Sequence, residues 1–169
     1  MNRFLLFLTL SAVLFSCAPD PLCNDPMAIN YEDVDDLCEY QSSINFYVSV
    51  NSLELMQENV PSGSLYYNVW VRLFLGQNPN SNSNSKSYGL AFLTPDENLD
   101  NSNYFDPTDC TSLSYNSFKV DKLADNPNGI LFDCQMILEY SNEDQIVLWE
   151  GEVHFDPSDT CKIIEIPYE

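Results

Sequence analysis

The chain has 169 residues, of which 44% are hydrophobic and 13% aromatic, and its formal net charge is −20. This apolar content is enough for a folded core and argues against a disordered chain. The negative charge argues against a nucleic-acid partner, because phosphates are bound mainly by Lys and Arg. It also argues against unaided adsorption to an anionic lipid surface. Solubility outside the cell explains such a charge, and the alternative is the binding of divalent cations.

Residues 1–16 differ from the rest of the chain and predict a secretory signal peptide. Arg3 is a single positive charge in front of an apolar run from Phe4 to Phe15, which only Thr9 and Ser11 interrupt. The run is shorter than the roughly 20 apolar residues that a membrane-spanning helix needs. A cleaved signal is therefore the better interpretation.

The end of this signal carries the residues Leu14-Phe15-Ser16-Cys17. They resemble the lipobox of bacterial lipoproteins, except that Phe15 is bulkier than the usual residue at that position. The resemblance implies cleavage before Cys17, a lipid on its side chain, and attachment of the exported protein to a membrane. Because Ala18 follows, it implies the outer membrane and leaves open the periplasmic side or the cell surface. The alternative is an ordinary cleaved signal with an incidental cysteine.

Residues 17–22 form a short tether, and residues 23–40 form a small module bounded by Cys23 and Cys38. A segment this short cannot bury a core of its own, and in an oxidising compartment a disulfide between the two cysteines closes it. Closing a loop of about 15 residues is worth about 3 kcal/mol in the chain-entropy model.

The sequence of this module has a recognisable pattern. Cys23-Asn24-Asp25-Pro26-Met27-Ala28-Ile29-Asn30-Tyr31 and the later Asp35-Asp36-Leu37-Cys38-Glu39-Tyr40 resemble a short module of surface and secreted proteins of the Bacteroidota. Leu37 stands where that module usually has Gly-Ser. The resemblance supports an exported protein and implies no activity.

The acidic residues inside the module are the candidate metal ligands. Glu32, Asp33, Asp35 and Asp36 offer the hard oxygen atoms that Ca²⁺ prefers. Their spacing is not that of an EF-hand loop, and no glycine supplies its sharp turn. A solvated acidic face is the alternative interpretation.

From residue 42 to residue 169 apolar residues recur at every second position, which predicts half-buried strands. About seven strands predict an all-β domain, a single antiparallel β-sandwich or small barrel. The short turn at residues 141–144 predicts a hairpin, and Leu53–Glu58 fits either one helical turn or a continuing strand. The apolar positions that mark the strands are Ile44 to Val50, Tyr67 to Leu75, Tyr88 to Phe92, Phe118 to Val120, Phe132 to Tyr140, Val147 to Phe155 and Ile164 to Tyr168.

Two long connections interrupt these strands, a polar one at residues 76–87 and an acidic one at residues 94–111. Long loops on a β scaffold often bind ligands and are often disordered, and both interpretations stay open. The segments Phe105–Cys110 and Phe155–Cys161 both begin with Phe-Asp-Pro and end in cysteine. Similar turns at corresponding rims predict a disulfide between Cys110 and Cys161, with Cys134 left as a buried thiol.

The search for catalytic residues leaves two classes of function. His154 is the single histidine, which excludes a site with several histidines, and it is expected to face solvent. The chain has neither a Gly-x-Ser-x-Gly turn nor a phosphate loop. The first class is a non-catalytic envelope lipoprotein that binds a glycan or an envelope protein. The alternative is an envelope hydrolase whose carboxylates cannot be singled out among 26 acidic residues.

Three aromatic residues form a candidate ligand surface. Tyr66, Trp70 and Phe74 are out of phase with the Val/Leu face of the second predicted strand. Such a row can stack on sugar rings or pack against a partner. Because Asn68 and Arg72 alternate with them, the favoured interpretation is the second buried face of a central strand.

Overall fold

The computed structural model describes residues 22–33, 36–75, 85–90, 93–141, 144–159 and 161–168. The predicted signal peptide, the lipidation site Cys17, the candidate ligand Asp35 and most of the loop at residues 76–87 lie outside the described residues. Within the described ranges, no helix is both long enough and apolar enough to cross a bilayer.

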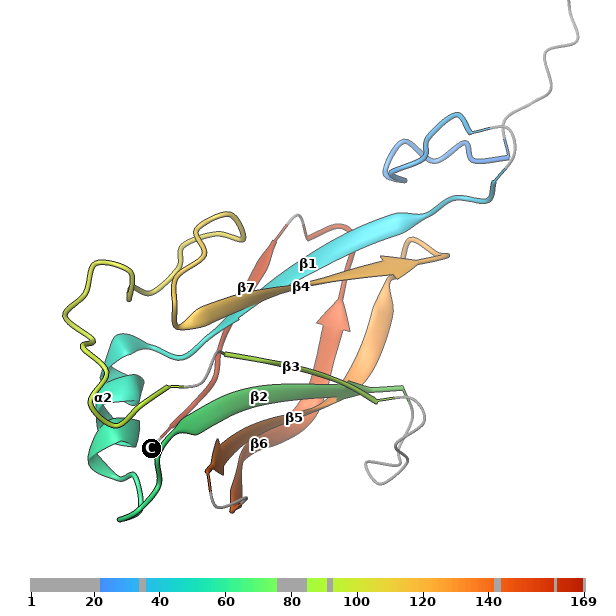
Figure 1. The fold of residues 1–169 in the computed structure, drawn as a ribbon. Helices are drawn as coiled ribbons and strands as arrows, with labels where there is room; N and C mark the ends of the chain where they lie inside the picture. The colour runs from blue at the N-terminus through green and yellow to red at the C-terminus, as the bar shows by residue number, and fades with distance from the viewer. Residues whose placement is uncertain are drawn as a thin grey trace, which may run out of the picture.

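The described chain forms seven strands and one short helix. These elements are β1 (Tyr40–Tyr47), α2 (Val50–Glu58), β2 (Tyr67–Phe74), β3 (Ser85–Gly89), β4 (Ser117–Ala124), β5 (Ile130–Tyr140), β6 (Gln145–Phe155) and β7 (Lys162–Glu165). A three-stranded sheet of order β4-β1-β7 stacks on a four-stranded sheet of order β3-β2-β5-β6 (Figure 1). Neighbouring strands are antiparallel, except that β1 and β7 are parallel. This arrangement confirms the predicted sandwich, and it is not a closed barrel.

The core lies between the two sheets because alternate side chains of each strand point there. In β2, Tyr67, Val69 and Val71 are all fully buried. Phe46 of β1 and Leu138 of β5 belong to the same buried cluster and come from opposite sheets. The period of two in the sequence therefore identified the inward-facing residues of these strands.

The first predicted strand ends early because a helix follows it. α2 begins at Val50, and the side chain of Ser49 caps the helix by accepting a hydrogen bond from the backbone N–H of Ser52. Leu53 and Met56 lie three residues apart on one face of the helix and are fully buried. Of the two alternatives for residues 53–58, the helix is therefore present.

The predicted hairpin of β5 and β6 has one irregularity. Met136 of β5 pairs with Trp149, whereas the next residue, Ile137, pairs with Val147, so that Leu148 is an extra residue. Such a β-bulge interrupts the in–out alternation of a strand. Trp149 consequently points between the sheets together with Met136, while Val147 is on the outer side and is 51% exposed. The sequence groups Val147 and Trp149 in one alternating set, and the bulge separates them.

The module at residues 23–40 sits at one end of the sandwich, beside the start of β1 (Figure 1). It has a small buried cluster of its own, in which Cys23, Ala28 and Tyr40 pack against Ala124 at the end of β4. Tyr40 belongs both to this cluster and to β1, so the module continues directly into the sandwich.

Candidate functional site

Both predicted disulfides are present. Cys23 is bonded to Cys38 with Cα atoms 4.6 Å apart, and Cys110 is bonded to Cys161 with Cα atoms 5.7 Å apart. Among the described cysteines Cys134 is the free thiol, and it is buried. Burial raises the pKa of this thiol to about 12. The thiol therefore stays protonated and is a poor nucleophile.

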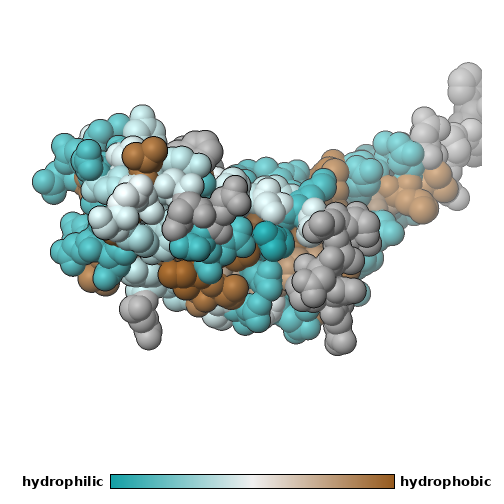
Figure 2. Space-filling model, turned by 60° about the horizontal axis from the view of Figure 1, so that its bottom comes forward, coloured by the Kyte–Doolittle hydropathy of each residue, from teal (hydrophilic) through white to brown (hydrophobic). Residues whose placement is uncertain are grey.

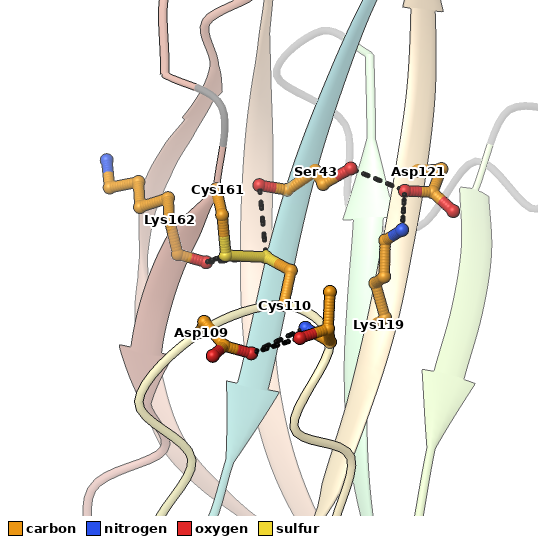
Figure 3. Close-up of polar contacts among 8 residues, drawn as sticks. Ser43, Asp109, Cys110, Lys119, Asp121, Cys161 and Lys162 are labelled. Atoms are coloured by element: carbon orange, nitrogen blue, oxygen red, sulfur yellow. Dashed lines mark hydrogen bonds and ion pairs between the residues drawn. A yellow bond between two sulfur atoms is a disulfide. The ribbon is translucent and has the colours of Figure 1, made fainter.

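The acidic loop after β3 packs on the outer face of the three-stranded sheet (Figure 3). We call residues 94–116 the strap. Asn45 points to this outer side of β1 but is fully buried, and its side-chain amide donates to the carbonyl of Asp109 at 3.1 Å. The Sγ atom of Cys110 lies 4.0 Å from the carbonyl oxygen of Ser43. The disulfide to Cys161 thus holds the strap across β1 and ties it to the residue that precedes β7.

An aspartate close to each cysteine of this disulfide accepts hydrogen bonds from the residues that follow it. The carboxylate of Asp109 accepts hydrogen bonds from the hydroxyl of Thr111 at 2.8 Å and from the backbone N–H groups of Thr111 and Ser112 at 2.8 and 2.7 Å. These bonds, first of all that of the Thr111 side chain, lower the pKa of Asp109 to about 2. Asp156 accepts in the same way from the hydroxyl and N–H of Ser158. In the repeated Phe-Asp-Pro segments, however, the counterpart of Asp156 is Asp106, whose carboxylate accepts from the backbone N–H of Val50 at 3.2 Å, so the two segments do not form the same turn.

The residues that carry the module's resemblance serve its own fold. The carboxylate of Asp25 accepts a hydrogen bond from the hydroxyl of Tyr40 at 2.7 Å. The side chain of Asn30 donates to the carbonyl of Leu37 at 2.9 Å and accepts from the N–H of Glu39 at 2.8 Å. These contacts hold the two ends of the module together beside its disulfide.

The candidate calcium ligands lie on the surface of the module. Glu32 and Asp36 are exposed, and the backbone N–H of Asp36 donates to the carboxylate of Asp33 at 3.3 Å. Among the described residues, no three His, Cys, Asp or Glu side chains are grouped so that they would hold a metal ion. Since Asp35 is outside the described residues, Ca²⁺ binding at these four positions stays a prediction.

The three aromatic residues of the candidate ligand surface lie on the outer side of β2, and they do not form one exposed strip. Tyr66 and Trp70 are partly buried, and Phe74 is only 5% exposed. The ring of Trp70 lies against Gly89 of β3, where a Cβ atom would come within 2.4 Å of it. The indole N–H of Trp70 is buried without a hydrogen-bond partner in the described structure.

The same outer face of the four-stranded sheet carries three neighbouring acidic residues, Asp133, Glu150 and Glu152. A depression of about 410 Å³ is lined by Phe74, Asp133, Glu150 and Glu152. Figure 2, which turns the underside of the molecule forward, shows a mostly hydrophilic surface with several small hydrophobic patches. Glu150 accepts a hydrogen bond from Gln135 and, like Glu152, is exposed. A carboxylic acid that serves as a catalytic acid needs a desolvated environment, and this face is open to water.

A second depression lies between the sheets, and β6 and β7 form its two walls. Its volume is about 300 Å³. We call it the β6–β7 groove. Met136, Trp149 and Val153 line it from the four-stranded sheet, and Ile164 lines it from β7. An adjoining depression that shares Glu165 and Pro167 with it continues toward α2. The other residues at the groove are Glu152, Lys162, Glu165 and Pro167, and those of the continuation are Ser52 and Tyr168.

The wall at Trp149 depends on a glycine two residues further along β6. A Cβ atom at Gly151 would lie 2.4 Å from Cζ2 of the Trp149 ring. The ring therefore lies flat along its own strand, and only a residue without a side chain permits this position. Trp149 is partly exposed because the groove is open on its outer side.

The edge of the sheet beside the groove carries unpaired backbone groups. β6 is the last strand of its sheet and β7 is the last strand of the other, and in the described part of the chain no strand pairs with their outer edges. Every second residue of such an edge directs its N–H and C=O groups outward. An apolar depression and a row of hydrogen-bonding groups thus lie side by side.

Comparison of the chain with family models, with curated proteins and with solved structures found no match. The candidate site is accordingly defined by geometry alone. Sequence reasoning missed the β6–β7 groove. The available signal was the glycine two residues after a tryptophan in a strand, a spacing that allows the ring to lie flat.

Proposed function

We propose that this protein is a non-catalytic binding protein of the cell envelope, held at the outer membrane by a lipid on Cys17, and that its sandwich binds a partner protein in the β6–β7 groove. The observation that carries the proposal is the apolar groove beside an unpaired strand edge. Binding sites are mostly apolar with a few polar groups, and an unpaired edge can bond another polypeptide backbone. The mostly apolar walls favour a protein side chain over a glycan as the occupant, although Glu152, Lys162 and Glu165 also line the groove.

The side chains that most often perform catalysis support a non-catalytic role. The ring of His154 contacts the carbonyl oxygen of Asn128 at 2.7 Å. The thiol of Cys134 is buried and protonated at neutral pH, because burial raises its pKa to about 12. The carboxylates Glu150 and Glu152 stand on an open sheet face. None of these groups has the paired, desolvated arrangement of a nucleophile and its base.

The proposed anchor is tested by mass spectrometry of the protein isolated from membranes. We expect an N-terminus at Cys17 with the mass of a lipid added. Cys17→Ser should leave the precursor uncleaved or release the protein in soluble form. An unmodified N-terminus at any other residue would refute the anchor.

The proposed groove is tested by photo-crosslinking in intact cells. A benzophenone side chain replaces Ile164, which lines the groove, and in the control it replaces Leu123, which is 56% exposed on β4. We expect a protease-sensitive adduct from position 164 and none from position 123. Equal adducts from both positions, or none from position 164, would contradict a protein partner in the groove. A protease-resistant adduct would indicate a glycan.

A further inference from the structure

We propose that the partner supplies an extended, basic segment that adds as a strand to the free edge of β6 and places alternate apolar side chains in the β6–β7 groove. This inference rests on the proposed function and specifies the binding mode and the chemistry of the ligand. Its three supports are the shape of the groove, the charge of β6 and the position of the bulge.

The groove accepts side chains from one side of an added strand. The inward-facing residues of β6 next to it are Trp149, Gly151 and Val153. An antiparallel neighbour places its side chains directly beside those of β6, with Cβ atoms about 5 Å apart. Every second residue of the added strand would therefore project into the groove, opposite Ile164 of β7. Apolar residues fit these positions because the walls of the groove are apolar.

The remaining side chains of the added strand would lie on the outer face of the sheet. There the neighbours on β6 are Glu150 and Glu152, and the register places Asp133 of β5 beside Glu152. Opposite charges across a strand pair stabilise it, and like charges destabilise it. The net charge of −20 adds long-range attraction for a cation. Lysine or arginine is therefore expected at the alternate positions of the segment.

The same charges disfavour a second copy of this chain as the occupant. Pairing two β6 edges would bring Glu150 and Glu152 of both copies onto one face of the joined sheet. Like charges directly opposite each other destabilise a strand pair, and each copy carries a net charge of −20. Proteins use such charges to keep edge strands from pairing with each other. The edge of β6 can therefore pair with a basic segment, whereas pairing with β6 of a second copy is disfavoured.

The bulge limits where the added strand can lie. Leu148 interrupts the regular edge, because bulges disturb the ladder and twist the strand. The regular part of β6 after the bulge runs from Trp149 to Phe155. It contains both glutamates and the residues that line the groove. A segment of about six residues, close to the usual length of a strand, fits this stretch.

The test uses a capped peptide of about seven residues that alternates lysine and valine. The protein is the exported, oxidised chain carrying Cys17→Ser, and binding is measured by calorimetry. Trp70→Phe leaves Trp149 as the single tryptophan of the chain, so its fluorescence reports the groove directly. If Trp70→Phe does not fold, calorimetry with the unsubstituted tryptophans still decides the outcome. We expect the alternating peptide to bind and a peptide with all lysines before all valines to bind at least tenfold more weakly.

Two further peptides test the pairing with the backbone of β6. One is N-methylated at the lysines and the other at the valines. In an added strand the N–H groups of only one of these two sets point to the neighbouring strand. Exactly one methylated peptide should lose binding, by tenfold or more.

Substitutions on the protein test the role of charge. Glu150→Gln with Glu152→Gln should weaken binding roughly fivefold. The control is Asp96→Asn with Asp100→Asn, which removes two exposed charges of residues that do not line the groove and should change affinity by less than about twofold.

Two outcomes overturn the inference. The first is that both methylated peptides bind as well as the parent, and the second is that no alternating peptide binds at concentrations up to about 1 mM. If position 164 still gives protein adducts in cells, only strand addition fails and the proposed function stands. If position 164 gives no adduct, the proposed function itself fails.

Discussion

The sandwich has two long sides, one formed by the edge strands β3 and β4 and the other by the edge strands β6 and β7. The two sides differ in what fills the space between the sheets. On the side of β3 and β4, Lys122 reaches between the sheets, and its ammonium group lies 2.6 Å from the hydroxyl of Tyr88 and 5.0 Å from the centroid of the Phe132 ring. On the side of β6 and β7, the β6–β7 groove is open and Trp149 is partly exposed.

Under the proposed function, this difference separates a structural side from a binding side. A lysine that spans the sheets fills one side with its methylene groups and holds its charge against two aromatic rings. The other side keeps an apolar wall in reach of solvent, which costs stability in a monomer and is explained if a ligand covers it. β7 forms one lip of the groove, which we call the β7 lip; its pairing with β1, the disulfide at Cys161 and the packing of Ile164 on the core hold it in place.

Removal of the Cys110–Cys161 disulfide is expected to have the largest effect. The two cysteines are 51 residues apart, and the chain-entropy model gives about 4 kcal/mol of stability for a loop of that length. Replacing both by serine should lower the urea midpoint and loosen the β7 lip. In the Trp70→Phe background, the fluorescence of Trp149 should then shift to the red.

The matched control replaces Cys23 and Cys38, which are 15 residues apart and belong to the module. Loss of this disulfide should lower the free energy of unfolding by about 3 kcal/mol at most. The fluorescence of Trp149 should not change, because the module packs against Ala124 at the end of β4 and does not line the groove. Equal red shifts from both double variants would show that the strap does not support the groove.

The second prediction compares two glycines that lie against tryptophan rings. Gly89→Ala should destabilise the fold by about 2 kcal/mol, because its Cβ atom would meet the Trp70 ring at 2.4 Å and the backbone carbonyl of Val69 at 2.8 Å. Gly151→Ala should cost less than about 1 kcal/mol, because its nearest neighbours are all atoms of the Trp149 ring, which can swing into the open groove. Chemical denaturation measures both values. Equal costs would mean that Trp149 is held as firmly as Trp70.

The third prediction concerns the closed side. Lys122→Met keeps the length of the side chain and removes its charge, its hydrogen bond to Tyr88 and its contact with two rings. We expect a loss of about 1 kcal/mol in unfolding free energy. The affinity for the alternating peptide should not change, since Lys122 lies on the opposite side. A loss of peptide binding in this variant would show that the two sides are coupled.

These contrasts also show what the sequence could predict. Alternation identified the strands because each buries one face. The repeated Phe-Asp-Pro segments predicted the Cys110–Cys161 pair, which is present, although the two segments do not form the same turn. The burial of Asn45 on an outer face could not be predicted, because it depends on where the strap packs. The groove was missed because one extra residue, Leu148, decides which way Trp149 points, and the glycine at position 151 indicates only that the ring can lie flat.

The smallest expected effect is a pH dependence of the stability, which arises from Asp109 in the strap. The carboxyl of Asp109 holds the turn of the strap before Cys110, and its pKa is lowered from 3.8 to about 2 by hydrogen bonds from Thr111 and Ser112. A carboxyl with a lowered folded-state pKa stabilises the fold above its unfolded value, and this contribution is lost as the pH falls toward about 2. Asp109→Ala should therefore be slightly less stable than the unsubstituted protein at pH 5 to 7, and the difference should shrink toward zero between about pH 4 and 2. Denaturation midpoints measured across this range test it, with the exposed Asp100→Asn as the control for losing one charge.

Because Asp109 precedes the cysteine that ties the strap to β7, the Trp149 signal should follow the same titration, while a variant at Lys122 should not alter it. A stability difference that stays constant down to pH 2 would mean that the charge of Asp109 does not hold the turn.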